Sequence, residues 1–135
     1  MTFEEIEVGQ SAEFTKNISD EDVMLFAKVS GDFNPVHVDE TAASKSQFGG
    51  RIAHGMLTAG LISAAIAGKL PGPGSVYLSQ SLRFTAPVRI GDTVTATVSV
   101  IELVPAKRRV KLSTVCTNQK GETVIQGEAL VMVST

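Results

Sequence analysis

The chain has 135 residues, of which 43% are hydrophobic and 19% are charged, a composition typical of one folded globular domain. Its 12 lysines and arginines against 14 aspartates and glutamates give a net charge of −2, which argues against a nucleic-acid partner, since such a partner requires a dense basic surface. Cys116 is the single cysteine, so it cannot form an internal disulfide. The cysteine and the two histidines do not have the spacing of a zinc site. We therefore expect one domain over residues 1–135 and no resident metal.

The N-terminus and the longest apolar segment both argue against export or a membrane partner. Residues 1–7 are acidic and lack the basic stretch and apolar run of a signal peptide. The apolar segment 56–67 is shorter than the roughly 20 residues that a transmembrane helix needs, and a Pro-Gly-Pro-Gly sequence follows it at 71–74. The sequence therefore predicts a cytoplasmic protein in which this segment is a buried helix.

The first half of the chain is predicted to be helical. Ser19 and the three acids that follow it form an N-cap and an acidic first turn, and Gly31 can end this helix. A second short helix is expected over residues 39–46. The segment 55–70 carries small or aliphatic side chains around its whole circumference, so we expect a helix that protein surrounds on all sides.

The second half is predicted to form four long antiparallel strands, because apolar and polar residues alternate with a period of two. The apolar positions change parity at Ile101, which predicts a β-bulge or a strong bend near Val100. The expected strands are residues 76–84, 93–103, 109–117 and 123–133.

Helices followed by a run of antiparallel strands indicate an α+β fold. The sheet must wrap around the helix at 55–70, because no other part of the chain is large enough to cover it. A sheet curled around one helix leaves an outer face or an edge exposed, and pairing with a second copy would cover it. We therefore expect a homodimer.

A short loop after the first helix carries side chains suited to acid–base chemistry. Pro35 restricts the backbone and keeps Asn34 out of the helical region, so the side chains of Asp32, Asn34 and His37 can converge on one point. A carboxylate and an imidazole are the commonest groups for moving protons near neutral pH. The loop is therefore a candidate catalytic site.

Two other interpretations of this loop stay open. An Asp-x-Asn-Pro sequence also forms ordinary turns, in which the Asp and Asn side chains bond to the backbone. A metal site is the weaker alternative, because the spacing of its candidate ligands matches no metal motif. Those candidates are Asp32, His37, Asp39 and His54.

The start of the apolar helix is a second candidate feature. The free backbone N–H groups at a helix start, here that of Gly55, could bind a carbonyl oxygen that becomes negative. Glycine also lets a ligand approach the backbone closely. Alternatively, Gly55 only begins a tightly packed helix, and the preceding His54 is a structural histidine.

Three segments together resemble the signature of the MaoC-like (R)-specific enoyl-CoA hydratases, and the resemblance extends over nearly the whole chain. They are Phe26–His37, Ala53–Met56 and Leu82–Asp92. The resemblance implies a hot dog fold, in which a long antiparallel sheet wraps around one central helix, usually in a dimer. It also implies reversible addition of water to a trans-2-enoyl thioester, which forms (R)-3-hydroxyacyl-CoA without a cofactor.

The resemblance assigns a role to each candidate residue. Asp32 and His37 would hold one water against C3 of the enoyl group and handle its proton, and the N–H of Gly55 would stabilise the enolate oxygen. Asn34 is a candidate supporting residue. Ser63 corresponds to a site serine in some relatives, although a serine in an alanine-rich helix commonly serves packing alone.

The carrier of the acyl group is a further expectation, since an acyl-CoA or an acyl-carrier-protein thioester would undergo the same chemistry. Four basic residues could contact CoA phosphates, or could form an ordinary solvated turn. They are Arg83, Lys107, Arg108 and Arg109.

Two competing functions use the same scaffold. A hot dog acyl-CoA thioesterase would need a carboxylate on the central helix, and residues 55–70 contain no Asp or Glu. A non-catalytic acyl-binding module would not need the pair formed by Asp32 and His37. Both alternatives are therefore less favoured than the hydratase.

Overall fold

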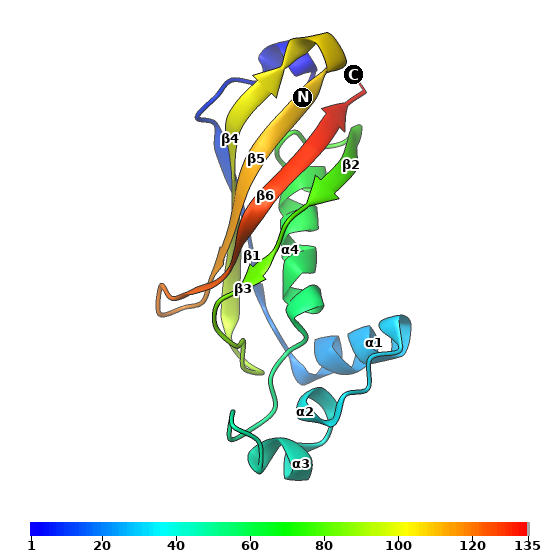
Figure 1. Cartoon of the computed structure of the whole chain (residues 1–135), viewed down its shortest axis with the longest axis vertical. Coiled ribbons are helices and arrows are strands. Elements are labelled where there is room, and N and C mark those ends of the chain that lie inside the picture. Colours follow the sequence, from blue (N-terminus) through cyan, green and yellow to red (C-terminus); the bar gives the residue numbers. More distant parts are fainter. Residues whose placement is uncertain (135) are drawn as a thin grey trace.

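In the computed structural model, which describes residues 1–134, a curved antiparallel sheet wraps around one long helix (Figure 1). The strands are β1 (Ser11–Asn17), β2 (Ser75–Gln80), β3 (Arg83–Phe84), β4 (Thr93–Val104), β5 (Arg109–Thr117) and β6 (Thr123–Val133). The α-helices are α1 (Asp20–Ser30), α2 (Pro35–Val38), α3 (Glu40–Ser44) and α4 (Gly55–Gly68). Short 3₁₀ turns occur at Phe3–Glu5 and Pro105–Lys107. The predicted α+β class is confirmed.

The strands follow the order β1-β4-β5-β6-β2, and β3 pairs with β6 off this path. The pairing of β4 with β5 shifts register between Val100 and Glu102, which confirms the predicted bulge. The sequence analysis did not predict β1, although all of it pairs with β4. Only Ala12 and Phe14 of this strand pack against the core, so its alternation was too weak to be recognised.

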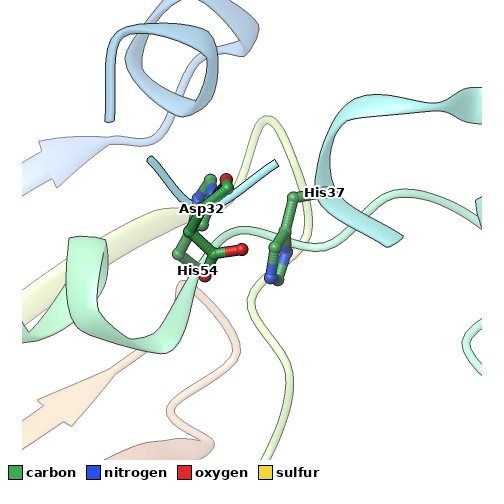
Figure 2. A group of neighbouring side chains, drawn as sticks. All are labelled: Asp32, His37 and His54. Carbon is green, nitrogen blue, oxygen red and sulfur yellow. Dashed lines mark hydrogen bonds between the residues drawn. The ribbon is translucent and has the colours of Figure 1, made fainter. Parts of the chain in front are cut away.

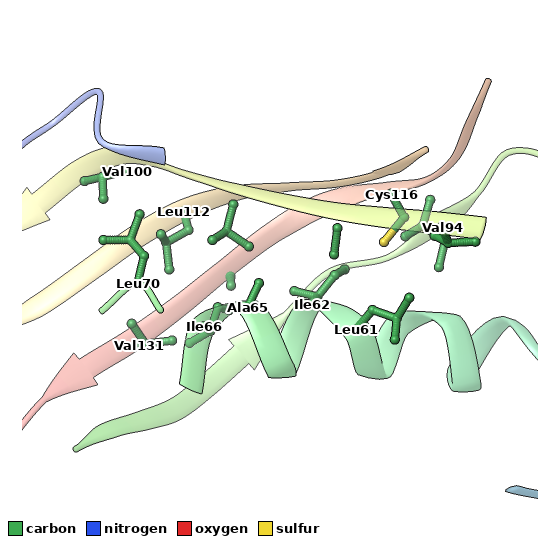
Figure 3. Close-up of a cluster of buried hydrophobic side chains, with 14 of the residues drawn as sticks. Leu61, Ile62, Ala65, Ile66, Leu70, Val94, Val100, Leu112, Cys116 and Val131 are labelled. Carbon is green, nitrogen blue, oxygen red and sulfur yellow. The ribbon is translucent and has the colours of Figure 1, made fainter. Parts of the chain in front are cut away.

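The hydrophobic core lies between α4 and the concave face of the sheet (Figure 3). Helix side chains such as Ile62 and Ile66 point toward the strands, and each fully buried aliphatic side chain of this size stabilises the fold by roughly 1.5–3 kcal/mol. The buried strand residues that face them include Val94, Val100, Leu112, Cys116 and Val131. No helix within residues 1–134 is both long and apolar enough to cross a membrane.

One face of α4 is not covered, so the expectation that protein surrounds this helix on all sides is wrong for a single chain. Met56, Gly60, Ser63 and Ala67 are exposed, and their spacing of three or four residues places them on one face. We call these four residues the open face of α4. The sheet covers only the opposite face of the helix.

The predicted strand 76–84 is two short strands, β2 and β3, instead of one. The chain between them leaves the β2 ladder at Ser81 and crosses close to β6. The N–H of Ser81 donates to the carbonyl of Glu128 at 2.9 Å, and the N–H of Glu128 donates to Ser81 Oγ at 3.0 Å. Gly127 permits this approach, because a Cβ there would lie 1.9 Å from the Ser81 carbonyl oxygen.

We expect the substitution Gly127→Ala to lower the free energy of unfolding by at least about 1–3 kcal/mol, because the added methyl group must displace a backbone carbonyl. Urea denaturation followed by circular dichroism measures this change. The neighbouring substitution Glu128→Ala is the control, since Glu128 is exposed and its loss should change stability by less than about 0.5 kcal/mol. Equal stabilities of the two variants would contradict this account of the crossing.

Candidate active site

Helix α1 and its two ends determine where the loop from Asp32 to His37, called the acidic loop here, begins. The N–H of Asp22 donates to Ser19 Oγ at 3.1 Å, and the N–H of Ser19 donates to the Asp22 carboxylate at 3.0 Å, which confirms the predicted cap. The bond from the Ser19 N–H to the Asp22 carboxylate lowers the pKa of Asp22. Gly31 ends the helix with φ of +83°, a left-handed conformation that favours glycine. The chain therefore turns sharply just before Asp32.

The loop from Asp32 to His37 is folded by hydrogen bonds between its side chains and its backbone. The Asp32 carboxylate accepts from the N–H of Asn34 at 3.1 Å, and Asn34 Oδ1 accepts from the N–H of Val36 at 3.3 Å. Asn34 is therefore the N-cap of α2, the short helix that carries His37. The turn interpretation and the site interpretation are thus compatible, because the turn is what places His37.

His37 is held by bonds to Arg51 and Ile52, which lie on the segment before α4. Its Nδ1 lies 2.8 Å from the carbonyl oxygen of Ile52, which can only accept, so Nδ1 carries the hydrogen and Nε2 stays available for proton transfer. The Nε–H of Arg51 donates to the carbonyl of His37 at 2.6 Å, and the Arg51 guanidinium pairs with Asp20 of α1 at 2.6 Å. Figure 2 shows the Asp32 carboxylate directed toward the His37 ring.

His54 completes this group, and the sequence does not predict it as a member of the catalytic set. Its side chain is only 2% exposed, and its Nε2 lies 3.0 Å from the backbone carbonyl oxygen of Asp32. Its ring stacks on that of His37, with 4.0 Å between centroids and 30° between planes, and also contacts Phe26. The one sequence feature that could have indicated a role for His54 is its position directly before Gly55, at the start of α4.

The three side chains in Figure 2 offer ligand atoms that lie within 4.8 Å of one another, a spacing that raises the metal interpretation again. The lone pairs of an imidazole lie in the plane of its ring. Two stacked rings therefore aim their nitrogens along separate planes, and both cannot reach one ion at a bond length of about 2.1 Å. The arrangement of His37 and His54 suits proton transfer better than metal binding.

A cavity of about 440 Å³ opens beside these groups. Its polar end contains Asp32, His37 and His54, which are the only ionisable residues that line it within the described part of the chain. Its remaining walls are mostly apolar and include Ile52, Met56, Phe84, Val88, Val124 and Ile125. The cavity can therefore hold an apolar chain with a polar end group against Asp32 and His37.

Gly55 lies in the wall of this cavity, at the first position of α4. No acceptor within residues 1–134 bonds to its backbone N–H, so this donor is free at the positive end of a helix of 14 residues. The ring of Phe84 packs against it, and a Cβ at Gly55 would lie 2.5 Å from Phe84 Cε1. Only glycine fits beneath this ring as it is placed.

The other candidate residues lie elsewhere in a single chain. Ser63 is on the open face of α4, two turns beyond Met56, and does not line the cavity. Asn34 is exposed and does not line the cavity either, so it acts through the backbone that it caps. The basic residues at 107–109 lie at the opposite end of the sheet from the start of α4 (Figure 1), where Arg108 pairs with Glu4 at 3.1 Å. Arg83 is exposed beside Phe84 on β3.

Comparison with known proteins finds relatives over nearly the whole chain. The family model described as a MaoC like domain matches residues 3–129. The chain is 58% identical to an (R)-specific enoyl-CoA hydratase from Rhodospirillum rubrum, over 97% of this chain and 90% of the relative. It is 53% identical to a 3-hydroxybutyryl-CoA dehydratase from Methylorubrum extorquens, over 97% and 83% of the two chains. An unliganded R-hydratase structure from Pseudomonas aeruginosa is 53% identical and superimposes with a TM-score of 0.93, over 98% and 84% of the two chains.

We expect Asn34→Ala to destabilise the protein by about 1 kcal/mol, because it removes the N-cap of the helix that carries His37. Asn34→Asp is the matched control, since a carboxylate oxygen can accept the same bond from the N–H of Val36. Urea denaturation compares the two. A loss of stability that is equal in both variants would show that the cap is not what Asn34 contributes.

Proposed function

Since the chain belongs to the MaoC-like family, we propose that it is an (R)-specific enoyl-CoA hydratase, which adds water reversibly to trans-2-enoyl-CoA and forms (R)-3-hydroxyacyl-CoA. The observation that carries this proposal is the placement of Asp32 and His37 at the polar end of an apolar cavity that also contains the free N–H of Gly55. The names of the two similar enzymes both refer to CoA thioesters, which favours CoA over acyl-carrier-protein as the carrier.

The acid–base pair handles the water. The Asp32 carboxylate and His37 Nε2 hold one water molecule between them, on one face of the enoyl group. Its oxygen bonds to C3 while one of its protons passes to the pair, and the pair returns a proton to C2. Because the two groups share one proton, they act as a unit and not as separate acid and base. Attack from a single face gives a single enantiomer.

The start of α4 stabilises the charge that develops during this reaction. When water adds at C3, negative charge moves to the thioester oxygen as an enolate forms. The N–H of Gly55 donates to that oxygen, and the aligned peptide dipoles of α4 favour negative charge at the same point. Asn34 supports the site by capping α2, so it positions His37 without contacting the substrate. The proposal gives Ser63 no contact with the substrate within one chain.

We also infer that two copies pair through β2 and the open face of α4. β2 is the last strand in the sheet order, and its side chains Val76, Tyr77 and Leu78 are each about two-fifths exposed. An unpaired apolar edge next to an uncovered helix face is a surface that proteins commonly bury by self-association. One domain over residues 1–135 and a cytoplasmic location both stay predictions; a continuous core from Phe3 to Val133 supports the former.

The reaction is tested with crotonyl-CoA. We expect loss of the enoyl absorbance, an (R)-3-hydroxybutyryl product and no release of thiol. Asp32→Asn and His37→Gln should each lower kcat by about 10²–10⁴, and the double variant should be scarcely worse than either single one. Asp39→Asn is the matched acid-to-amide control, because Asp39 is exposed, lies outside the cavity and caps α3, which Asn does equally well.

The thiol measurement distinguishes the competing functions. Release of CoA thiol in proportion to enzyme would move the assignment to a thioesterase, and no turnover of any enoyl thioester would favour a binding module. The protein's own cysteine does not interfere, because Cys116 is fully buried and burial raises the pKa of its thiol to about 12. Its thiolate form, the one that thiol reagents attack, is therefore negligible in the folded protein.

The assembly is tested by light scattering. We expect a species of about 28 kDa, twice the 14.2 kDa of one chain. Leu78→Asp places a charge on the β2 edge and should shift the protein toward the monomer. Ile101→Asp is the matched control, because Ile101 is exposed to the same degree (41% against 42%) but lies on β4. A monomer in the unsubstituted protein would overturn this proposal.

A further inference from the structure

We propose that His54 is a positioning residue, which holds Asp32 and His37 in the arrangement that captures the water. This inference rests on the proposed hydration reaction and adds a residue to its machinery. His54 lies on the segment that leads into α4, whereas the acid–base pair lies on the loop after α1. Its side chain contacts both members of the pair, through the backbone carbonyl of Asp32 and the ring of His37.

The first contact fixes the backbone of Asp32. The other bonds at this end of the loop are local, since the N–H of Asp32 donates to Ser30 Oγ and its carboxylate accepts from Asn34. The bond from His54 Nε2 to the carbonyl oxygen of Asp32, at 3.0 Å, spans 22 residues. It therefore ties Asp32 to the start of α4, where Gly55 lies.

The second contact fixes the plane of the His37 ring. One face of that ring lies on the ring of His54, at 4.0 Å between centroids, and its Nδ1 is bound by the carbonyl of Ile52. Phe26 of α1 contacts His54 in turn, with 4.8 Å between ring centroids. A ring that is constrained at one face and at one nitrogen has little freedom, so Nε2 points in a fixed direction.

The burial of His54 argues against a role in packing alone. Its Nδ1 is buried and has no hydrogen-bond partner within residues 1–134, which is unfavourable for a polar atom. A leucine or phenylalanine would fill the same space without that cost. Keeping a histidine here is therefore explained by the donor at Nε2 and by the flat ring, which serve Asp32 and His37 respectively.

The hydrogen bonds of His37 to Ile52 and of His54 to Asp32 predict opposite tautomers for the only two histidines in the chain. Each ring faces a carbonyl oxygen that can only accept, so His37 carries its hydrogen on Nδ1 and His54 on Nε2. Two-bond ¹H–¹⁵N spectra in alkaline buffer, where imidazole is neutral, should show one ring of each kind. His54→Phe leaves a single set of signals and thereby assigns His37.

Three variants separate the two contacts. His54→Gln keeps a donor near the position of Nε2 and loses the ring, His54→Phe keeps the ring and loses the donor, and His54→Leu loses both. We expect His54→Leu to lower kcat about 10–100-fold, as for a small misplacement of catalytic groups, with KM changed less than about twofold. The other two variants should lie between it and the unsubstituted enzyme. In His54→Leu, the His37 ring loses the stack that holds its plane and can rotate away from the Ile52 carbonyl, so its signals should show a mixture of tautomers.

Leu112→Ala is the control for stability, because it removes buried volume from the core on β5 without touching the cavity. It should lower the melting temperature while leaving kcat and the two histidine signals unchanged. The proposal is overturned if the His54 variants keep both kcat and the His37 tautomer, or if kcat falls no further than in Leu112→Ala. Failure of the hydratase assignment is a separate result, since it appears as absent turnover in the unsubstituted enzyme, whereas the histidine spectra still report the positioning.

Discussion

The packing of α4 against the concave face of the sheet determines the position of every group in the site. Buried side chains such as Ile62 and Ile66 fix the helix against the strands, so its first residue, Gly55, has a fixed place beside the cavity. The acidic loop is then attached to the same helix end through His54 and Ile52. Hydrophobic packing is not directional, yet the packing of α4 on the sheet determines where the polar groups of the site lie.

Much of this arrangement could be predicted from the sequence, because the strongest local patterns coincide with the elements that matter most. The alternation of β4, β5 and β6 gave their positions closely, and the change of parity gave the bulge at Val100. The cap at Ser19 and the stop at Gly31 located α1. The fold class followed, and so did the loop from Asp32 to His37, whose residues are close in sequence as well as in space.

The remaining features depend on contacts between distant segments, which local patterns do not encode. The division between β2 and β3 follows from the close approach of Ser81 to Gly127, which are 46 positions apart in the chain. β1 is mostly exposed and has few apolar residues, so only its partner β4 defines it. The role of His54 depends on a stack with His37 and a bond to Asp32, and no spacing rule relates these residues.

In the proposed dimer, the position of Met56 would link catalysis to assembly. This residue lines the cavity and is also the first member of the open face of α4. In the proposed dimer, a second copy that covers the open face would also close one side of the cavity and would exclude bulk water from the enolate. Dissociation by dilution would re-admit that water, so specific activity, and not only molecular mass, becomes a function of protein concentration.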